Sequence, residues 1–466
     1  MTISYMNQRE YIHLNWRAGF GAFPSLIAAS KKLSRKNSIN LLFEASKIIE
    51  PVQIDLSDFG DYFNTSYNKL KKNIGEEESR KLRQKSQKKV RELNFIWLNK
   101  IASSEQVLRE KMTLFWANIF VCKDTHILHT LKFNNTLRTY ALGNFVDFVK
   151  AISRSASMLK YLNNNRNFKK KPNENFAREL MELFTLGIGN YSESDIREAA
   201  RAFTGWSFKP NGEYVLRASK HDTDSKTFLG ENGNFGGDDI IDIITKQRAC
   251  AEFICTKVYR YFVNPTDDKD HIDELTAVFH KDYNIEQLMR YLFMTDWFYE
   301  EKNIGVKIKS PVELMVGMQK VIPSVFKKLN QVTYLQKMMG QTLLYPVNVA
   351  GWKGDRYWID SNSLMFRLKL PALVFNNAKI SLNPKGDFEA TFNEFYKEKK
   401  QRFSVDDNER AYFETHYSKW SFNELSEILV VPRIDVDTSK MLKAYQSQNS
   451  FQYCIQLMSI PEYQLC

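Results

Sequence analysis

The stretch that decides the fold is NENFARELMELFTLG, residues 173–187. Its apolar side chains recur every three or four residues, which predicts a helix with one buried face. Five other stretches repeat this rhythm, and no convincing series of alternating strands appears. We therefore predict a mainly α fold, a multi-helix globular domain. The five stretches are VLREKMTLFWANIF (107–120), SESDIREAARAFTGW (192–206), DDIIDIITKQRACAEFICTKVYRYFV (238–263), IEQLMRYLFMTDWFY (285–299) and SPVELMVGMQKVI (310–322).

The charged residues of the 173–187 stretch leave two interpretations open. Glu174, Arg178 and Glu182 are four residues apart, so they stack on one helix face and can form ion pairs. Glu179 lies beside that row. An ion-paired helix flank explains this pattern without any chemistry. The alternative is that Glu179 and Glu182 are catalytic carboxylates in the wall of a polar pocket.

Helix boundaries are marked by local signals. Ser192 with Asp195 resembles a capping box, and Gly205 is placed to stop that helix. Ser310 is placed as a cap with Pro311 in the first turn. Residues 238–263 predict one or two helices joined near residues 247–248.

Two stretches lack a helical pattern. Residues 207–238 form a long connection rich in Gly and Asp, in which GEYVLRAS (212–219) could pair with a strand near KTFLG (226–230) as a small β-hairpin. Residues 345–363 are rich in Gly, Trp and polar side chains. Long irregular connections are usually functional or disordered. We predict a main helical domain over residues 1–375, and a linker with a C-terminal helical segment, packed on the main domain, over residues 376–466.

The composition suits a globular protein, with 43% hydrophobic and 14% aromatic residues. No apolar run approaches the roughly 20 residues that span a membrane, and the first residues do not form a visible signal peptide. The five cysteines have no spacing typical of a zinc site or a local disulfide. We expect buried thiols and a cytoplasmic rather than an exported protein.

The net charge of +12 is unevenly distributed, because residues 1–100 hold 18 Lys and Arg against 10 Asp and Glu. Most of this excess lies in RKLRQKSQKKVR (80–91), on a helix predicted over residues 76–104. Such a run could meet phosphates, but a solvated helix face explains it equally simply. We do not expect nucleic-acid binding, since no nucleic-acid module accompanies the run.

The irregular stretches hold further candidate residues. His221 could act as an acid or base, and Lys226 could bind an anion. With Asp222 and Asp224 between them, the same segment could host a divalent cation, although no metal ligand set is defined. A lone His is equally consistent with a structural role. Further candidate ligand-binding residues are Arg178, Arg201, Trp206, Asn348, Trp352 and Asp360.

Two kinds of contact are possible for these residues. Arg201 could meet Glu179 or Glu182 across a helix interface. The aromatic and polar residues around Trp352 suit a glycan-like ligand, or else plug the loop into the core.

Several motifs together resemble one bacterial family, domain of unknown function 1800 (DUF1800). They include LREKMTLFW (108–116), LRTYALGNF (137–145), HDTDSKTFLG (221–230), KIKSPVELM (307–315) and NVAGWKGDRYWID (348–360), besides residues 173–187 and 191–206. The resemblance runs from WRAGFG (16–21) to PEYQLC (461–466). It implies no established activity. Members are often encoded beside domain of unknown function 1501 (DUF1501), which looks like the alkaline phosphatase and sulfatase group, so the resemblance implies a partner protein.

The sequence departs from the family pattern at three positions. Many relatives carry His where this chain has Ala117 and Ile119, and some carry His in place of Phe184. Two functional hypotheses follow. The chain could bind an anionic or glycan-like ligand in a pocket, perhaps as a metal-assisted or acid/base hydrolase using Glu179, Glu182 and His221. Alternatively, it is a non-catalytic helical scaffold for the partner, which the missing His residues favour.

Overall fold

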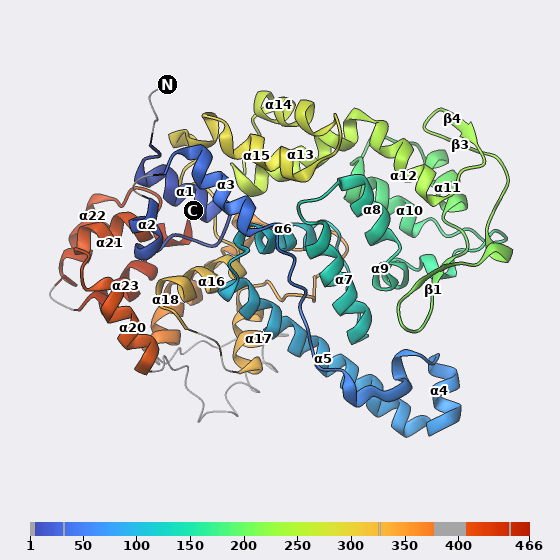
Figure 1. Cartoon of the computed structure of the whole chain (residues 1–466), viewed down its shortest axis with the longest axis horizontal. Helices are drawn as coiled ribbons and strands as arrows, with labels where there is room; N and C mark the ends of the chain where they lie inside the picture. Colours follow the sequence, from blue (N-terminus) through green and yellow to red (C-terminus); the bar gives the residue numbers. More distant parts are fainter. Residues whose placement is uncertain (1–4, 31–32, 325, 327, 377–406, 447–448) are drawn as a thin grey trace.

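The structure is a computed structural model that describes residues 5–30, 33–324, 326, 328–376, 407–446 and 449–466 (Figure 1). It confirms the mainly α prediction, and the strands of the described residues form two small antiparallel hairpins. The boundary predicted at residues 375–376 stays a prediction, and most of the predicted linker lies outside the described residues. The α-helices are α1 (Gln8–Arg17), α2 (Pro24–Ser30), α3 (Arg35–Ala45), α4 (Tyr67–Ile74), α5 (Glu76–Ser103), α6 (Val107–Ala117), α7 (Ile127–Tyr140), α8 (Phe145–Ser153), α9 (Ala156–Tyr161), α10 (Asn175–Glu179), α11 (Glu193–Ala202), α12 (Gly237–Lys246), α13 (Arg248–Phe262), α14 (Lys269–Phe279), α15 (Ile285–Met294), α16 (Pro311–Val321), α17 (Leu329–Met338), α18 (Ser361–Phe375), α20 (Asp407–Tyr417), α21 (Phe422–Leu429), α22 (Val436–Lys443) and α23 (Ser450–Met458).

The predicted caps are present. Ser192 with Asp195 and Ser310 with Glu313 form capping boxes, and Pro311 occupies the first turn of α16. The helical stretch is interrupted between α12 and α13 at Gln247, whose backbone is extended. Short 3-10 helices add turns between the longer elements. They are η1 (Ser57–Phe63), η2 (Asn164–Arg166), η4 (Ala218–Lys220), η5 (Trp297–Tyr299), η6 (Glu301–Asn303), η7 (Asp355–Trp358) and η8 (Glu462–Gln464).

The predicted strand pairing was wrong. The strand expected within residues 212–219 exists as β2 (Tyr214–Leu216), but it pairs with β1 (Trp206–Phe208) and not with KTFLG. The turn KPNG between them (209–212) closes this hairpin because Gly212 takes a φ of +84°. The KTFLG segment instead forms β3 (Lys226–Phe228), which pairs with its own neighbour β4 (Glu231–Gly233).

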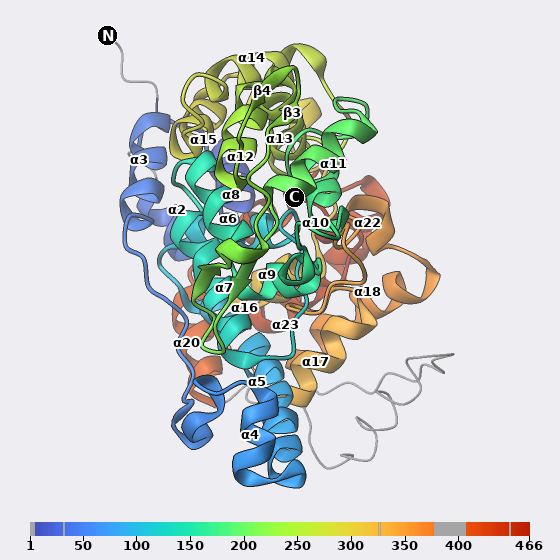
Figure 2. The ribbon, with the colours of Figure 1, turned by 90° about the vertical axis from the view of Figure 1, so that its right-hand side faces the viewer.

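Two hydrophobic cores lie under this helical shell. The first core is built mainly from α6–α15, and the second from α1, α5, α16–α18 and the C-terminal helices α20–α23. Helix α6 contributes to both, since Met112 and Phe115 belong to the first core and Leu114 to the second. Figures 1 and 2 show the red C-terminal helices beside the blue N-terminal ones, so the two ends of the chain close one body.

Helix α6 also carries two adjacent buried charges. Glu110 accepts from Arg138 of α7 at 2.6 Å and from the Trp97 indole of α5 at 3.1 Å. Lys111 pairs with Glu313 of α16, and Lys307 donates to the same carboxylate oxygen at 2.7 Å. Lys111 and Glu313 are 1% and 0% exposed, so this is an ion cluster in the interior.

The pKa shifts show how strongly the cluster is coupled. Burial would raise the pKa of Glu313, but the ammonium groups of Lys111 and Lys307 outweigh burial and hold it far below the usual range. Burial lowers the pKa of Lys111 to about 8, against the opposing effect of Glu313. Each side of the pair therefore requires the other to remain charged.

We expect Glu313→Gln to destabilise the protein by about 3–5 kcal/mol, because it leaves two buried ammonium groups without a carboxylate. Chemical denaturation monitored by circular dichroism measures this loss. The control is Asp437→Asn, which breaks an exposed pair with Lys440 and should change stability by less than about 1 kcal/mol. An equal effect of the two substitutions would contradict the central role of Glu313.

Candidate functional site

The stretch at residues 173–187 does form a helix, but only its first part is α-helical. Helix α10 ends at Glu179 and continues as the π-helix η3 (Leu180–Thr185). The wider turn is visible in the bond from the Leu186 amide to the Met181 carbonyl, five residues back, at 2.8 Å. π-Helical turns occur frequently at functional sites. This one sets the relative positions of the two predicted carboxylates.

Glu179 and Glu182 lie close together and are half-buried. Burial, and then the neighbouring Glu182 carboxylate, raise the pKa of Glu179. Tyr161 shares this environment, because burial, Cys122 and Glu179 all raise the pKa of its hydroxyl. The Tyr191 hydroxyl donates to Glu182 at 3.3 Å. The arrangement is a carboxylate pair held among hydroxyls.

One of the expected arginine contacts is present and one is not. Arg178 pairs with Glu174 on its own helix and with Glu193 of α11 through two bonds of 2.9 and 2.8 Å. Arg201 does not reach Glu179 or Glu182, because Glu198 and Asp222 already hold its guanidinium at 2.8 Å. The two helices therefore meet through a different ion pair from the one proposed.

The His221 segment is ordered by its own contacts. His221 Nδ1 lies 2.8 Å from the Thr204 carbonyl, which can only accept, so Nδ1 is the donor. Lys226 is buried, and its ammonium donates to the carbonyls of Asp222 and Asp224 at 2.9 and 2.8 Å. Burial lowers the pKa of Lys226. Lys226 thus holds the loop in place.

The remaining predicted ligand-binding residues have structural contacts. Trp206 is buried against Phe203, and a Cβ on Gly237 would lie only 2.2 Å from its ring. Trp352 is also buried. Asn348 Oδ1 accepts from the Ala350 amide, and Asp360 caps α18 by accepting from the Asn362 and Ser363 amides.

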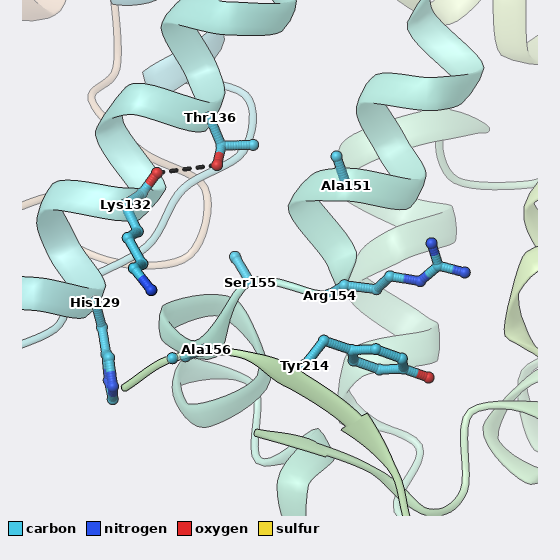
Figure 3. Close-up of a pocket in the computed structure, with 9 residues that line it drawn as sticks. His129, Lys132, Thr136, Ala151, Arg154, Ser155, Ala156 and Tyr214 are labelled. Atoms are coloured by element: carbon cyan, nitrogen blue, oxygen red, sulfur yellow. Dashed lines mark hydrogen bonds between the residues drawn. The ribbon is translucent and has the colours of Figure 1, made fainter. Parts of the chain in front are cut away.

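A cavity of about 270 Å³ opens between α7, α8 and the β1–β2 hairpin, and none of the ten predicted site residues lines it. Figure 3 shows Lys132 reaching in from α7, Ser155 and Ala156 opposite it, and the Tyr214 ring at one side. The lining contains no carboxylate. Its residues are His129, Lys132, Thr136, Ala151, Arg154, Ser155, Ala156, Gly212 and Tyr214.

Two cationic groups dominate the charge of this cavity. The Lys132 ammonium is exposed and donates to the Asn211 carbonyl of the hairpin at 2.7 Å, which leaves it two further N–H groups. Arg154 extends over the Tyr214 ring, 5.3 Å from its centroid, and pairs with Asp238. The hydroxyls of Thr136 and Ser155 already donate to backbone carbonyls. Lys132 is therefore the side chain best placed to hold a ligand.

A buried carboxylate and two stacked imidazoles lie behind the wall of the cavity. Asp124 accepts from Lys160 at 2.5 Å and lies 3.6 Å from His129 Nδ1. His129 Nε2 contacts the Pro210 carbonyl at 2.8 Å, which fixes the hairpin tip. His126 stacks on His129 with ring centroids 3.7 Å apart. Lys132 and His129 thus clasp the same turn, Pro210–Gly212.

His126 is the N-cap of α7, because its Nδ1 accepts from the His129 amide at 3.4 Å. This role requires an unprotonated ring. Burial, and then the neighbouring His129, lower the pKa of His126 to about 3. This cluster was not among the predicted site residues. Its sequence signal is DTHILH (124–129), in which an Asp and two His residues fall within two turns of the start of a helix.

Among the described residues, no group of three or more His, Cys, Asp or Glu side chains is arranged to hold a metal ion. The five cysteines are free. No helix in the described part of the chain has the length and apolar character needed to cross a membrane.

The low pKa of His126 makes stability depend on pH. In the unfolded chain the His126 ring takes up a proton near pH 6.5, whereas in the folded chain it does so only near pH 3. The free energy of unfolding therefore falls as the pH is lowered from about 6.5 to about 3. We expect His126→Asn, which keeps a capping side chain, to reduce the slope by up to about 1.4 kcal/mol per pH unit. Urea unfolding at a series of pH values measures the slope. His280→Asn, outside this cluster, serves as control; identical slopes for wild type and His126→Asn would refute the assignment.

Comparison with known proteins identifies a family whose description assigns no function. No curated protein and no solved structure matches the chain significantly. The sequence model of the family described as "Protein of unknown function (DUF1800)" matches residues 13–465. The match covers nearly the whole chain, so this protein belongs to the DUF1800 family.

Proposed function

We propose that the protein binds a small anionic ligand in the cavity between α7, α8 and the β1–β2 hairpin. The observation that carries this proposal is a lining with Lys132, Arg154 and His129 but no carboxylate. Because the Arg154 charge is partly balanced by Asp238, Lys132 is the main source of positive potential. An anion would gain charge-assisted hydrogen bonds from it.

The size of the cavity limits the ligand. Its volume of about 270 Å³ lies just below the range of roughly 300–1,000 Å³ typical of sites for drug-sized molecules. An inorganic oxyanion or a small organic acid fits this space. The Tyr214 ring offers an apolar side for the carbon part of such an acid.

The residues expected to catalyse do not line this cavity. A hydrolytic role for Glu179, Glu182 and His221 remains a separate proposal, supported by the raised pKa of Glu179 and by the partial exposure of all three side chains. Lys226 and Arg201 support it less, because their charged groups already hold the loop. Binding without catalysis is the simpler function for the cavity.

Isothermal titration of the full chain with inorganic phosphate and with citrate tests the proposal. We expect saturable binding, and no binding of the neutral sugar maltose at matched ionic strength. Lys132→Met should weaken binding by about tenfold or more, since it removes a charged hydrogen-bond donor worth about 1.5–3 kcal/mol.

The matched control is Lys209→Met. Lys209 lies on the same hairpin, pairs with Glu213 and does not line the cavity, so its replacement should leave affinity unchanged. Equal affinity of wild type and Lys132→Met, or binding of neither anion, would overturn the proposal.

A further inference from the structure

Helices α4 and α5 form an antiparallel arm that extends away from the body of the protein (Figures 1 and 2). The C-terminal half of α5 packs on α7, α16 and α17. Its N-terminal half buries little beyond Ser79, which donates to the Gly75 carbonyl, and Ser86, which bonds to Thr125 and Ile127 at the start of α7. The rest of this half is therefore available to solvent.

An exposed face of this arm carries the basic stripe, which we define as Arg80, Arg83, Lys88 and Arg91 with Gln84 and Gln87 between them. At 100° per residue these six side chains fall within one sector of the helix, and at 1.5 Å per residue they span about 16 Å. All six are exposed. No acidic residue interrupts the stripe.

The other cations of the same run have partners. Lys81 pairs with Glu77 and Glu78. Lys85 pairs with Asp58, and Lys89 with Glu92. By contrast, none of the four cations in the basic stripe pairs with a carboxylate of the described residues. The intramolecular ion pairs thus leave one continuous face of positive charge unbalanced.

Carboxylate side chains lie at both ends of this face. Glu76–Glu78 precede it at the tip of the arm, and Glu92 follows it. These carboxylates are balanced by Lys71, Lys81 and Lys89, so the unpaired positive charge is confined to the length of the stripe itself. A short acidic segment of about three helical turns would match the stripe in length and charge.

We propose that the basic stripe docks a short acidic segment of a partner protein. Arginine and glutamine side chains suit this role, because a guanidinium binds a carboxylate through two parallel hydrogen bonds and an amide adds donors between the charges. The contact is electrostatic and solvent-exposed, so its affinity falls as salt rises. This inference is independent of the proposed anion cavity.

Fluorescence anisotropy with the full chain tests the inference. The probe is a labelled Glu-rich peptide of three helical turns, compared with its Gln analogue, with a short duplex DNA, and with phosphatidylserine vesicles. We expect the Glu peptide to bind more tightly than the other three and to be released by salt. Tighter binding of the DNA or the vesicles, or no peptide binding at low salt, would overturn the proposal.

Charge-matched variants locate the contact. Arg80→Gln, Arg83→Gln and Lys88→Gln together should weaken peptide binding by about tenfold or more. The control replaces another exposed run of three cations, Lys169, Lys170 and Lys171, by Gln and should change affinity less than about twofold. Circular dichroism verifies that both variants remain folded. An equal loss in the two would assign binding to net charge alone and refute the stripe.

Discussion

The carboxylate of Glu313, buried with Lys111 and Lys307, is the interaction on which the packing of the two cores depends. An ammonium group without a partner costs several kcal/mol to bury. Lys111 can therefore stay inside only while α16 delivers Glu313 to it. Because α6 carries Lys111 and α16 belongs to the second core, this pair fixes how the first core sits against the second.

Helix α6 shows why buried ion pairs with neighbouring helices are needed. Glu110 and Lys111 are adjacent, so their side chains leave the helix about 100° apart and cannot share one partner. Each is satisfied by a different neighbour, Arg138 in one direction and Glu313 in the other. The motifs LREKMTLFW, LRTYALGNF and KIKSPVELM supply these charges. Their polar residues here specify helix packing, which explains strongly patterned sequence without requiring chemistry at these positions.

Features set by local sequence were predictable, and those set by distant contacts were not. The capping box at Ser192 and the cap at Ser310 depend on residues close in the sequence, and both were predicted correctly. Glu313 and Lys111 are separated by 202 residues, so the sequence could not reveal their pairing. The π-helix escaped prediction because an apolar rhythm of three and four residues does not distinguish it from an α-helix. Arg201 was assigned the wrong carboxylates because its partners are Glu198 on its own helix and Asp222, which lies 21 residues away in the sequence.

The candidate site was the least predictable feature, because a cavity depends on which side chains leave a space unfilled. The sequence pointed to loops and motif residues, whereas the cavity lies between two helices and a hairpin tip. His129, which is buried, and Lys132, which is exposed, contact the hairpin at residues 81 and 79 positions later in the sequence. Only the three-dimensional return of residues 210–212 to α7 brings them together.

Ala117, Ile119 and Phe184 stand at the three positions where the resemblance implies His in relatives. Ile119 and Phe184 are buried in the first core, and Phe184 packs on Phe120 with ring centroids 5.7 Å apart. Asn118 binds the backbone of Trp352 through two hydrogen bonds and seals the end of α6. An imidazole in place of Ile119 or Phe184 would need buried polar partners that the apolar packing around these two residues does not supply. Ile119 and Phe184 therefore contribute to packing, whereas the proposed ligand site uses the cationic side chains that line the cavity beside α7.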